Sequence, residues 1–205
     1  MRLLLIRHGE SEGNLEDAQP RPGDPPLTER GIRQAEEAGR RVLDEGLDIL
    51  YCGPLQRNLQ TAARIHQISG VKTVLLPAIF EVGANNILWD AKHIARQFPM
   101  VHIENGLDTR WSQALPESFQ QAWKRIKYIE NWLRKTYEAT DTRVGLITHG
   151  AMNDLLIGAC LGLDPGGHMR FSSGNCAFHW VELRSNVGKL LRLNDTFHIP
   201  DHDRS

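Results

Sequence analysis

Short apolar runs alternate along this chain with longer runs that have the period of a helix. The strand-like runs cover residues 2–7, 48–52, 72–76, 143–148, 176–184 and 189–194. The helix-period runs cover residues 27–46, 54–70, 119–137 and 150–162. Chains that alternate strands with helices form a mainly parallel sheet with helices on both faces. We therefore expect a three-layer α/β/α fold, and the turn-like "SNVG" between the last two strands predicts an antiparallel hairpin at one edge of the sheet.

The ends of the helical runs carry recognisable signals. Thr28 is a candidate N-cap of the first helix and Gly46 a candidate stop, because threonine can accept from free N–H groups and glycine readily adopts a left-handed conformation. For the second helix we expect Pro54 at the first helical position and Gly70 just past the end.

The composition limits the partners of the chain. Of the 205 residues, 40% are hydrophobic, which suffices for one core, and we expect a single domain over residues 1–205. Lysine and arginine number 24 against 25 aspartates and glutamates, so the chain lacks the basic excess of proteins that bind nucleic acid or acidic membranes. We expect neither partner, and a small anionic substrate would be held by local arginines.

Cysteine usage and hydropathy favour a cytoplasmic protein. Cys52, Cys160 and Cys176 are odd in number and share no close spacing, which is typical of reduced thiols rather than of a disulfide framework or a zinc site. The apolar run at residues 3–6 is too short for an export signal, and no apolar run approaches the length of a membrane span. The oligomeric state is left open, with a homodimer among the alternatives.

Two segments fall outside the alternation. Residues 83–116 have mixed composition and no long period, and we interpret them as an insertion over the sheet, a lid or substrate wall that is helical near residues 90–97. We expect the polar tail from Thr196 to be poorly ordered. Its "HIPDHD" stretch could be a metal site, but it lacks ligand spacing on a supporting scaffold, so a polar tail is the better interpretation.

Charged residues, histidines and two glycines lie at the ends of four of the predicted parallel strands. In chain order they are Arg7, His8, Gly9, Arg57, Glu81, His149 and Gly150. Ligands of an open α/β sheet bind outside the carboxyl ends of its strands. We therefore expect these residues to meet at one edge of the sheet.

The residue types suit phosphoryl chemistry. Arginine forks match phosphate oxygens, and the helix N-termini after Gly9 and Gly150 offer further N–H donors. A neutral imidazole is a good nucleophile, and a carboxyl group can protonate a leaving oxygen and then deprotonate water. Because the arginines neutralise charge, we expect no metal and no other cofactor. Taken singly, each residue has a structural alternative: a histidine can bond to nearby backbone, and an arginine or glutamate can be a solvated charge.

Three segments in this set resemble motifs of the histidine phosphatase superfamily, which includes the cofactor-dependent phosphoglycerate mutases. They are "RHGES" with Asn14 six residues after His8, "PLQRNLQTA" and "THGA", and they follow the family's order between residues 3 and 151. The resemblance implies a phosphoglycerate mutase-like fold and a phosphohistidine intermediate.

The resemblance also implies a role for each matching residue. His8 would be the nucleophile and Glu81 the proton donor. The phosphoryl group would be held by Arg7, Asn14, Arg57, His149 and Gly150. The stretch "ALPES" resembles the family's glycine-rich "GES" segment, so Glu117 and Ser118 are expected near the site. Taken alone, Asn14 could simply cap a turn.

Departures from the mutase pattern favour a phosphatase. The loop at residues 15–26 lacks the tryptophan-containing substrate segment of the mutases, and residues 83–116 lack their basic stretch. We expect a metal-independent phosphatase that hydrolyses a small phosphate monoester. Mutase-type phosphoryl transfer and an inactive phosphate-binding module are the alternatives, and the sequence does not give the physiological substrate.

Overall fold

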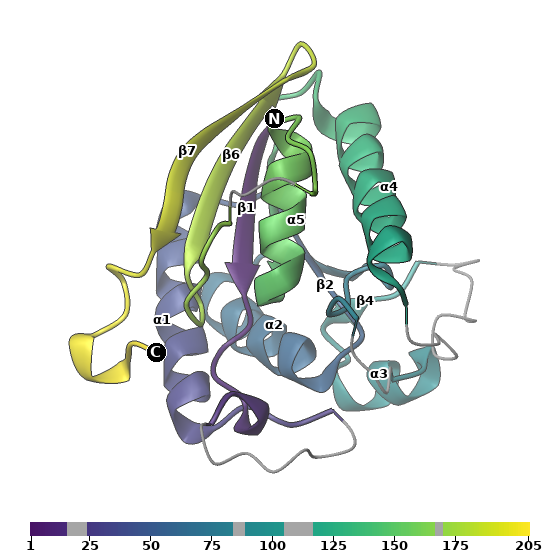
Figure 1. Ribbon diagram of the computed structural model, residues 1–205. Helices are drawn as coiled ribbons and strands as arrows, with labels where there is room; N and C mark the ends of the chain where they lie inside the picture. The colour runs from purple at the N-terminus through teal and green to yellow at the C-terminus, as the bar shows by residue number, and fades with distance from the viewer. Residues whose placement is uncertain (16–23, 84–88, 105–116, 167–169) are drawn as a thin grey trace.

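A single sheet runs through the part of the chain that the computed structural model describes, residues 1–15, 24–83, 89–104, 117–166 and 170–205 (Figure 1). Its strands lie in the order β4-β3-β2-β5-β1-β6-β7. They are β1 (Arg2–Arg7), β2 (Ile49–Cys52), β3 (Thr73–Leu75), β4 (Val101–His102), β5 (Arg143–Thr148), β6 (Phe178–Arg184) and β7 (Val187–Asp195). Strands β1 to β5 pair in parallel, whereas β6 and β7 form an antiparallel hairpin at the edge beside β1.

Helices cover both faces of the sheet, with α4 and α5 on one and α1 and α2 on the other (Figure 1). The α-helices are α1 (Glu29–Glu45), α2 (Gln56–Ser69), α3 (Ala91–Gln97), α4 (Phe119–Tyr137) and α5 (Gly150–Cys160). Short 3-10 turns are η1 (Glu12–Asn14) and η3 (Asp201–Asp203). The expected three-layer α/β/α fold with an antiparallel edge hairpin is confirmed.

Strand β1 is buried on both faces. Leu3 and Leu5 belong to the apolar cluster that includes α4 and α5, whereas Leu4 and Ile6 belong to the cluster that includes α1 and α2. All four side chains are 0% exposed. Because successive side chains of a strand point to opposite faces, an unbroken aliphatic run is what a strand between two helical layers requires.

Most of the predicted turn and cap signals are confirmed. The hydroxyl of Thr28 accepts from the Gly31 N–H at 3.0 Å, and Gly46 is left-handed with φ of 63°. The hairpin turn consists of Ser185 and Asn186, whose φ values of 52° and 63° give both central residues the left-handed backbone that two-residue hairpins prefer.

The expected start of α2 at Pro54 is wrong, because the helix begins at Gln56 after the N-cap Leu55. The Pro54 carbonyl oxygen accepts from the Trp89 N–H at 3.2 Å, so it bonds outside the helix. The preceding residue also packs tightly, since a Cβ on Gly53 would lie 1.8 Å from the Ile79 carbonyl oxygen. Contacts with the segment after β3 therefore keep this turn out of the helix.

The segment predicted as an insertion contributes to the sheet. The helix expected near residues 90–97 is confirmed as α3, where the Asp90 side chain accepts from the His93 N–H at 2.8 Å. Strand β4 was not predicted, and it pairs in parallel with β3 through Val101 and Thr73. Residues 84–88 and 105–116 lie outside the described residues, so the lid or substrate wall stays a prediction.

The expectation of a poorly ordered tail is wrong. Arg33 Nη2 lies 2.6 Å from Asp203 Oδ1, and Gln34 Nε2 donates to the Asp203 carbonyl at 2.7 Å and to the Ser205 hydroxyl at 2.9 Å. Ile199 is 1% exposed. The polar tail residues are therefore partners of α1, some 170 positions away in sequence.

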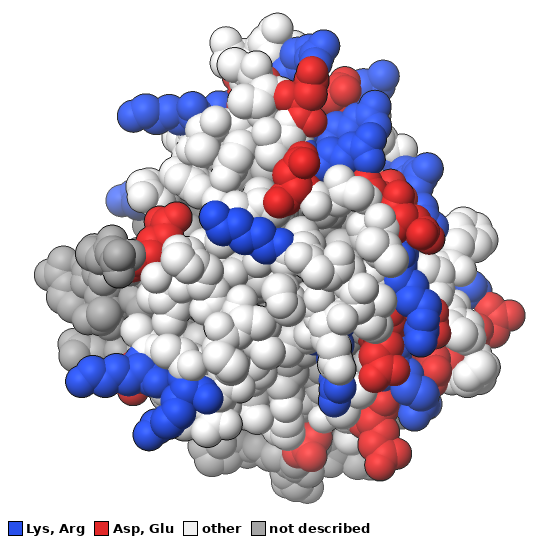
Figure 2. Space-filling model, turned by 180° about the vertical axis from the view of Figure 1, so that it is seen from behind, with Lys and Arg blue, Asp and Glu red and all other residues white. Residues whose placement is uncertain are grey.

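Charge is distributed unevenly on the face of the molecule that Figure 2 shows. Charged side chains of both signs gather along the side where α1 lies, while the middle of this face carries few charges (Figure 2). Pairs within that helix include Arg40 with Glu37 at 2.6 Å and Arg41 with Glu45 at 2.8 Å, as expected for a solvated helix face. Among the described residues, no helix combines the length and hydropathy needed to cross a membrane.

Gly31 lies where the loop after β1 crosses the first turn of α1. A Cβ on Gly31 would lie 1.9 Å from the Glu10 carbonyl oxygen, and a Cβ on Gly9 would lie 2.4 Å from the Gly31 carbonyl oxygen. We expect Gly31→Ala to lower the free energy of unfolding by about 1–3 kcal/mol through overpacking. Urea denaturation measures this difference.

Gly158→Ala in α5 is the matched control, because its added Cβ would meet nothing within 4 Å. Helix propensity predicts that this change leaves stability equal or raises it by up to about 1 kcal/mol. A Gly31→Ala protein as stable as Gly158→Ala would contradict the close approach.

Candidate functional site

The chain around His8 is fixed through its backbone. The His8 N–H donates to the Thr148 carbonyl oxygen at 3.0 Å, which carries the β1–β5 pairing one residue past the end of β1. The His8 carbonyl oxygen accepts from Asn175 Nδ2 at 3.1 Å. Its side chain is buried, and it therefore has a defined position at the carboxyl end of β1.

The hydrogen bonds of the His8 ring assign its tautomer. Nδ1 lies 2.8 Å from the carbonyl oxygen of Gly9, which can only accept, so Nδ1 carries the proton. Nε2 keeps its lone pair and accepts from Arg57 Nε at 3.3 Å. Burial, followed by the charges of Arg57 and Arg7, lowers the pKa of His8 well below its ordinary value. The ring is therefore neutral at neutral pH and its basic nitrogen lies against a guanidinium.

His149 lies beside His8 on the adjacent strand end. It is the N-cap of α5, and its ring centroid lies 5.2 Å from that of His8. The side chain is 0% exposed, yet neither ring nitrogen has a hydrogen-bond partner among the described residues. Burial, then the charge of Arg57, lowers the pKa of His149 well below its ordinary value. Buried polar atoms without partners are rare, so these nitrogens indicate where a polar ligand would bind.

Arg7 is oriented by the loop before β6. Its Nη1 donates to the Ser173 carbonyl oxygen at 2.7 Å, and the Ser173 hydroxyl lies 2.8 Å from His179 Nε2 and 3.1 Å from Asn153 Nδ2. The Nε of Arg7 is buried without a partner among the residues that the structure describes. An added Cβ on Gly150 would stand 3.8 Å from that Nε, so the free donor of Arg7 lies at the start of α5.

Arg57 is paired with Asp24, a residue that the sequence did not predict. Nη1 of Arg57 lies 3.0 Å from Asp24 Oδ1, and the other carboxylate oxygen accepts from the Gln56 N–H. Burial raises the pKa of Asp24 to about 6, against the opposing effects of the Gln56 N–H and Arg57. Asp24 therefore holds one end of the Arg57 guanidinium while Nε contacts His8.

Glu81 completes the set of predicted strand-end residues. One carboxyl oxygen accepts from the Val82 N–H at 2.8 Å. Burial raises its pKa, while the Val82 N–H, Arg57, Arg7 and the backbone of Met152 oppose that rise. The charges of both arginines therefore act on this carboxyl group, and a raised pKa is what a proton donor near neutral pH requires. The structure brings Arg7, His8, Arg57, Glu81 and His149 to one edge of the sheet.

Other predicted residues make structural contacts. The Asn14 amide oxygen accepts from the Ser11 N–H at 3.0 Å, as a turn-capping side chain does, and its contact with a phosphate oxygen stays a prediction. Ser118 is the N-cap of α4. Glu117 pairs with Arg125 on that helix. The described bonds of Glu117 and Ser118 thus lie within α4 and its start.

Asp24, Ser173 and Asn175 were missed by the sequence interpretation. Asp24 stands in "RPGDPP", where no periodicity selects one residue. Ser173 and Asn175 precede β6, and one signal could have found them. An antiparallel strand beside a parallel sheet begins at the edge where the parallel strands end, so residues before β6 lie beside residues after β1.

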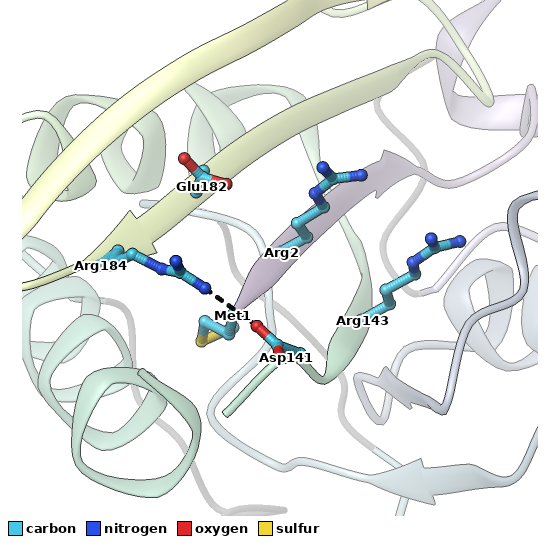
Figure 3. A pocket seen from close by; sticks show the side chains of 6 residues that line it. All are labelled: Met1, Arg2, Asp141, Arg143, Glu182 and Arg184. Carbon is cyan, nitrogen blue, oxygen red and sulfur yellow. Dashed lines mark hydrogen bonds and ion pairs between the residues drawn. The ribbon is translucent and has the colours of Figure 1, made fainter. Parts of the chain in front are cut away.

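The opposite edge of the sheet holds a cavity of about 350 Å³ (Figure 3). Its lining residues are Met1, Arg2, Asp141, Arg143, Glu182 and Arg184. Arg184 pairs with Asp141 at 2.9 Å with its side chain 66% exposed, and Arg2 stands in register with Glu182. The arginines of this cavity thus have carboxylates beside them, and the Arg184 side chain is largely exposed. At the carboxyl edge of the sheet, by contrast, the structure describes buried donors without partners. The carboxyl edge is therefore the better candidate for an anion site.

Comparison with known proteins identifies the family of proteins that this chain resembles. A family model described as the histidine phosphatase superfamily (branch 1) matches residues 3–196. Phosphoserine phosphatase 1 of Hydrogenobacter thermophilus is 24% identical over 206 residues, covering 97% of this chain and 94% of the relative. The probable phosphoglycerate mutase GpmB of Proteus mirabilis is 26% identical over 192 residues, covering 91% and 86%.

Solved structures show the same fold. The alpha-ribazole phosphatase from Shigella flexneri superposes with a TM-score of 0.71 at 23% identity, covering 96% of this chain and 97% of that chain. At this identity the likeness establishes the arrangement of strands and helices.

The buried Asp24 predicts a pH-dependent contribution to stability. Its pKa is raised from 3.8 to about 6, so the folded state binds the proton more tightly than the unfolded state. This stabilisation is complete below about pH 4 and is lost as the pH rises through about 6. We expect Asp24→Asn to gain up to about 3 kcal/mol relative to the unchanged protein between about pH 4 and pH 7.

Urea denaturation across that pH range measures the difference. Asp141→Asn is the control, because the Asp141 side chain is 95% exposed, and it should leave the pH dependence unchanged. Parallel stability curves for Asp24→Asn and the unchanged protein would contradict the assignment.

Proposed function

Because this chain belongs to the histidine phosphatase superfamily, we propose that it hydrolyses a small phosphate monoester in two steps, through a phosphohistidine on His8. Membership together with the phosphatase relatives supports a phosphoric monoester hydrolase. The observation that carries the two-step proposal is the hydrogen bonding of the His8 ring: Nδ1 lies 2.8 Å from the Gly9 carbonyl oxygen, which assigns the proton to Nδ1 and leaves Nε2 unprotonated beside Arg57.

In the first step, Nε2 of His8 attacks phosphorus in line with the leaving oxygen. The P–N bond forms as the P–O bond to the alcohol breaks, and Glu81 gives its proton to that oxygen. The unpartnered donors of Arg7 and His149 support binding of the non-bridging oxygens, because a phosphoryl group would satisfy them. Arg57, whose Nε already contacts Nε2 of His8, would also donate to these non-bridging oxygens.

In the second step, the Glu81 carboxylate takes a proton from water as the water oxygen attacks phosphorus. The P–N bond breaks, inorganic phosphate leaves, and Nε2 recovers its lone pair. The raised pKa of Glu81 supports both roles, since a carboxyl group that titrates closer to neutral pH can give and take a proton at that pH. Asn14 and Gly150 would contribute further contacts to the phosphate oxygens.

The substrate is a small phosphorylated compound in this proposal. Support comes from the relatives, whose names specify phosphoserine and alpha-ribazole phosphatase. We propose that the reaction needs no metal ion, because two buried guanidinium groups supply the positive charge that the phosphoryl oxygens require.

Mutase-type transfer is the second candidate, and the similarity to a probable phosphoglycerate mutase is the observation that favours it. The two activities differ in what accepts the phosphoryl group. When 3-phosphoglycerate is supplied with 2,3-bisphosphoglycerate, isomerisation much faster than phosphate release would favour the mutase.

Replacing the nucleophile tests the phosphatase. With p-nitrophenyl phosphate in EDTA, we expect the unchanged protein to turn over and His8→Ala to fall below detection, because the P–N bond can no longer form. Acid-labile, base-stable phosphate should be trapped on the unchanged protein only.

The control is His102→Ala, an exposed histidine on β4, which should retain full activity. Full activity of His8→Ala, or strict dependence on a divalent metal, would refute the proposal. Phosphate binding without turnover or trapping would indicate the inactive binding module instead.

A further inference from the structure

Arg125 on α4 donates hydrogen bonds to the backbone of the segment just before Glu81. Its Nη1 donates to the carbonyl oxygens of Ala78 at 2.8 Å and Phe80 at 3.1 Å. The guanidinium also lies over the Phe80 ring, 3.7 Å from the ring centroid. Glu81 is the next residue along the chain, so Arg125 fixes the peptide group that directly precedes it.

Glu117 holds the other side of the guanidinium. One carboxylate oxygen accepts from Arg125 Nε at 3.1 Å and the other from Nη2. Both side chains are 11% exposed, so the pair is largely shielded from solvent. A forked pair of this kind fixes the plane of the guanidinium as well as its position.

These contacts use all three nitrogens of Arg125 on protein groups. In this respect it differs from Arg7, whose Nε is left without a partner among the described residues. Arg125 is therefore suited to hold protein backbone rather than to bind phosphate. The backbone that it holds leads into a carboxyl group whose reach to a leaving oxygen depends on sub-ångström placement.

We propose that Arg125, locked by Glu117, is a positioning residue for proton transfer by Glu81 to the leaving oxygen. This inference rests on the proposed function. It gives Glu117 a role, since Glu117 acts on the site through Arg125 and the segment at residues 78–80. The reaction itself is unchanged: the proton still moves from Glu81 to the alcohol oxygen as the P–O bond breaks.

The proposal predicts a dependence on the leaving group. An alkoxide needs a proton as it departs, whereas p-nitrophenolate leaves unprotonated, so a misplaced acid slows hydrolysis of alkyl phosphates selectively. The quantity to measure is kcat/KM, because it reports the steps up to release of the alcohol and is independent of phosphohistidine hydrolysis.

We expect Arg125→Lys to lower kcat/KM for an alkyl phosphate such as glycerol phosphate by about 10- to 100-fold, and that for p-nitrophenyl phosphate by less than about threefold. Glu117→Gln should act in the same direction and more weakly, and it leaves Arg125 itself intact if the first variant folds poorly. Glu81→Gln provides the reference for complete loss of the acid and should show the steepest dependence.

Arg134→Lys is the matched control. Arg134 lies on the same helix, pairs with Glu130 and Glu138, and donates to the Cys160 carbonyl oxygen at 3.1 Å. It thus resembles Arg125 in chemistry but lies nine residues further along α4, about 14 Å away along the helix. We expect it to leave the ratio of the two kcat/KM values unchanged.

Equal losses on both esters in Arg125→Lys and Glu117→Gln would overturn the proposal, as would a selective loss in Arg134→Lys. Absence of any activity or trapped phosphate in the unchanged protein would instead refute the proposed function. If Glu81→Gln lowers kcat/KM equally for both esters while His8→Ala is inactive, the proposed phosphatase activity is retained. Glu81 is then not the proton donor, and the positioning role of Arg125 is refuted.

Discussion

The register between β1 and β5 is the constraint on which the candidate site depends. Arg7 pairs with Thr148, so the next residue on each strand is a histidine, and the two rings meet 5.2 Å apart. Both strands are buried between helical layers, and a slip by one residue would turn every aliphatic side chain of β1 toward the wrong layer. The same apolar packing that stabilises the sheet therefore aligns the two imidazoles.

Burial has opposite effects on the acidic and basic groups gathered at this edge. It lowers the pKa of both histidines and raises the pKa of Glu81 and Asp24, so each is shifted toward its neutral form. The guanidinium groups keep their charge even when buried. The edge thus combines charged guanidinium groups with two neutral imidazoles and a carboxyl group whose pKa is raised, which suits the binding of a doubly charged phosphate ester.

Sequence patterns anticipated what depends on local rules and missed what depends on contacts between distant segments. The aliphatic run before Arg7 and the caps of α1 follow from periodicity and side-chain chemistry. The rule that ligands bind at the carboxyl ends of parallel strands predicted that Glu81 lies near the arginines. Strand β4 spans two residues, too short for an alternation to be visible. Asp24 acts through Arg57, and the tail acts through α1, so neither has a signature in its own segment.

The hydrogen bonds of Ser205 set a condition on the timing of synthesis. Its hydroxyl donates to the Asn175 side-chain oxygen at 3.2 Å, and Asn175 in turn supports the His8 carbonyl. The same hydroxyl accepts from Gln34, which also receives the Glu10 N–H. His8 and Gln34, which the ribosome synthesises early, therefore acquire these hydrogen-bond partners only after Asn175 and Ser205 have been synthesised. The nascent chain cannot assemble this hydrogen-bond network around the nucleophile until residue 205 has left the exit tunnel.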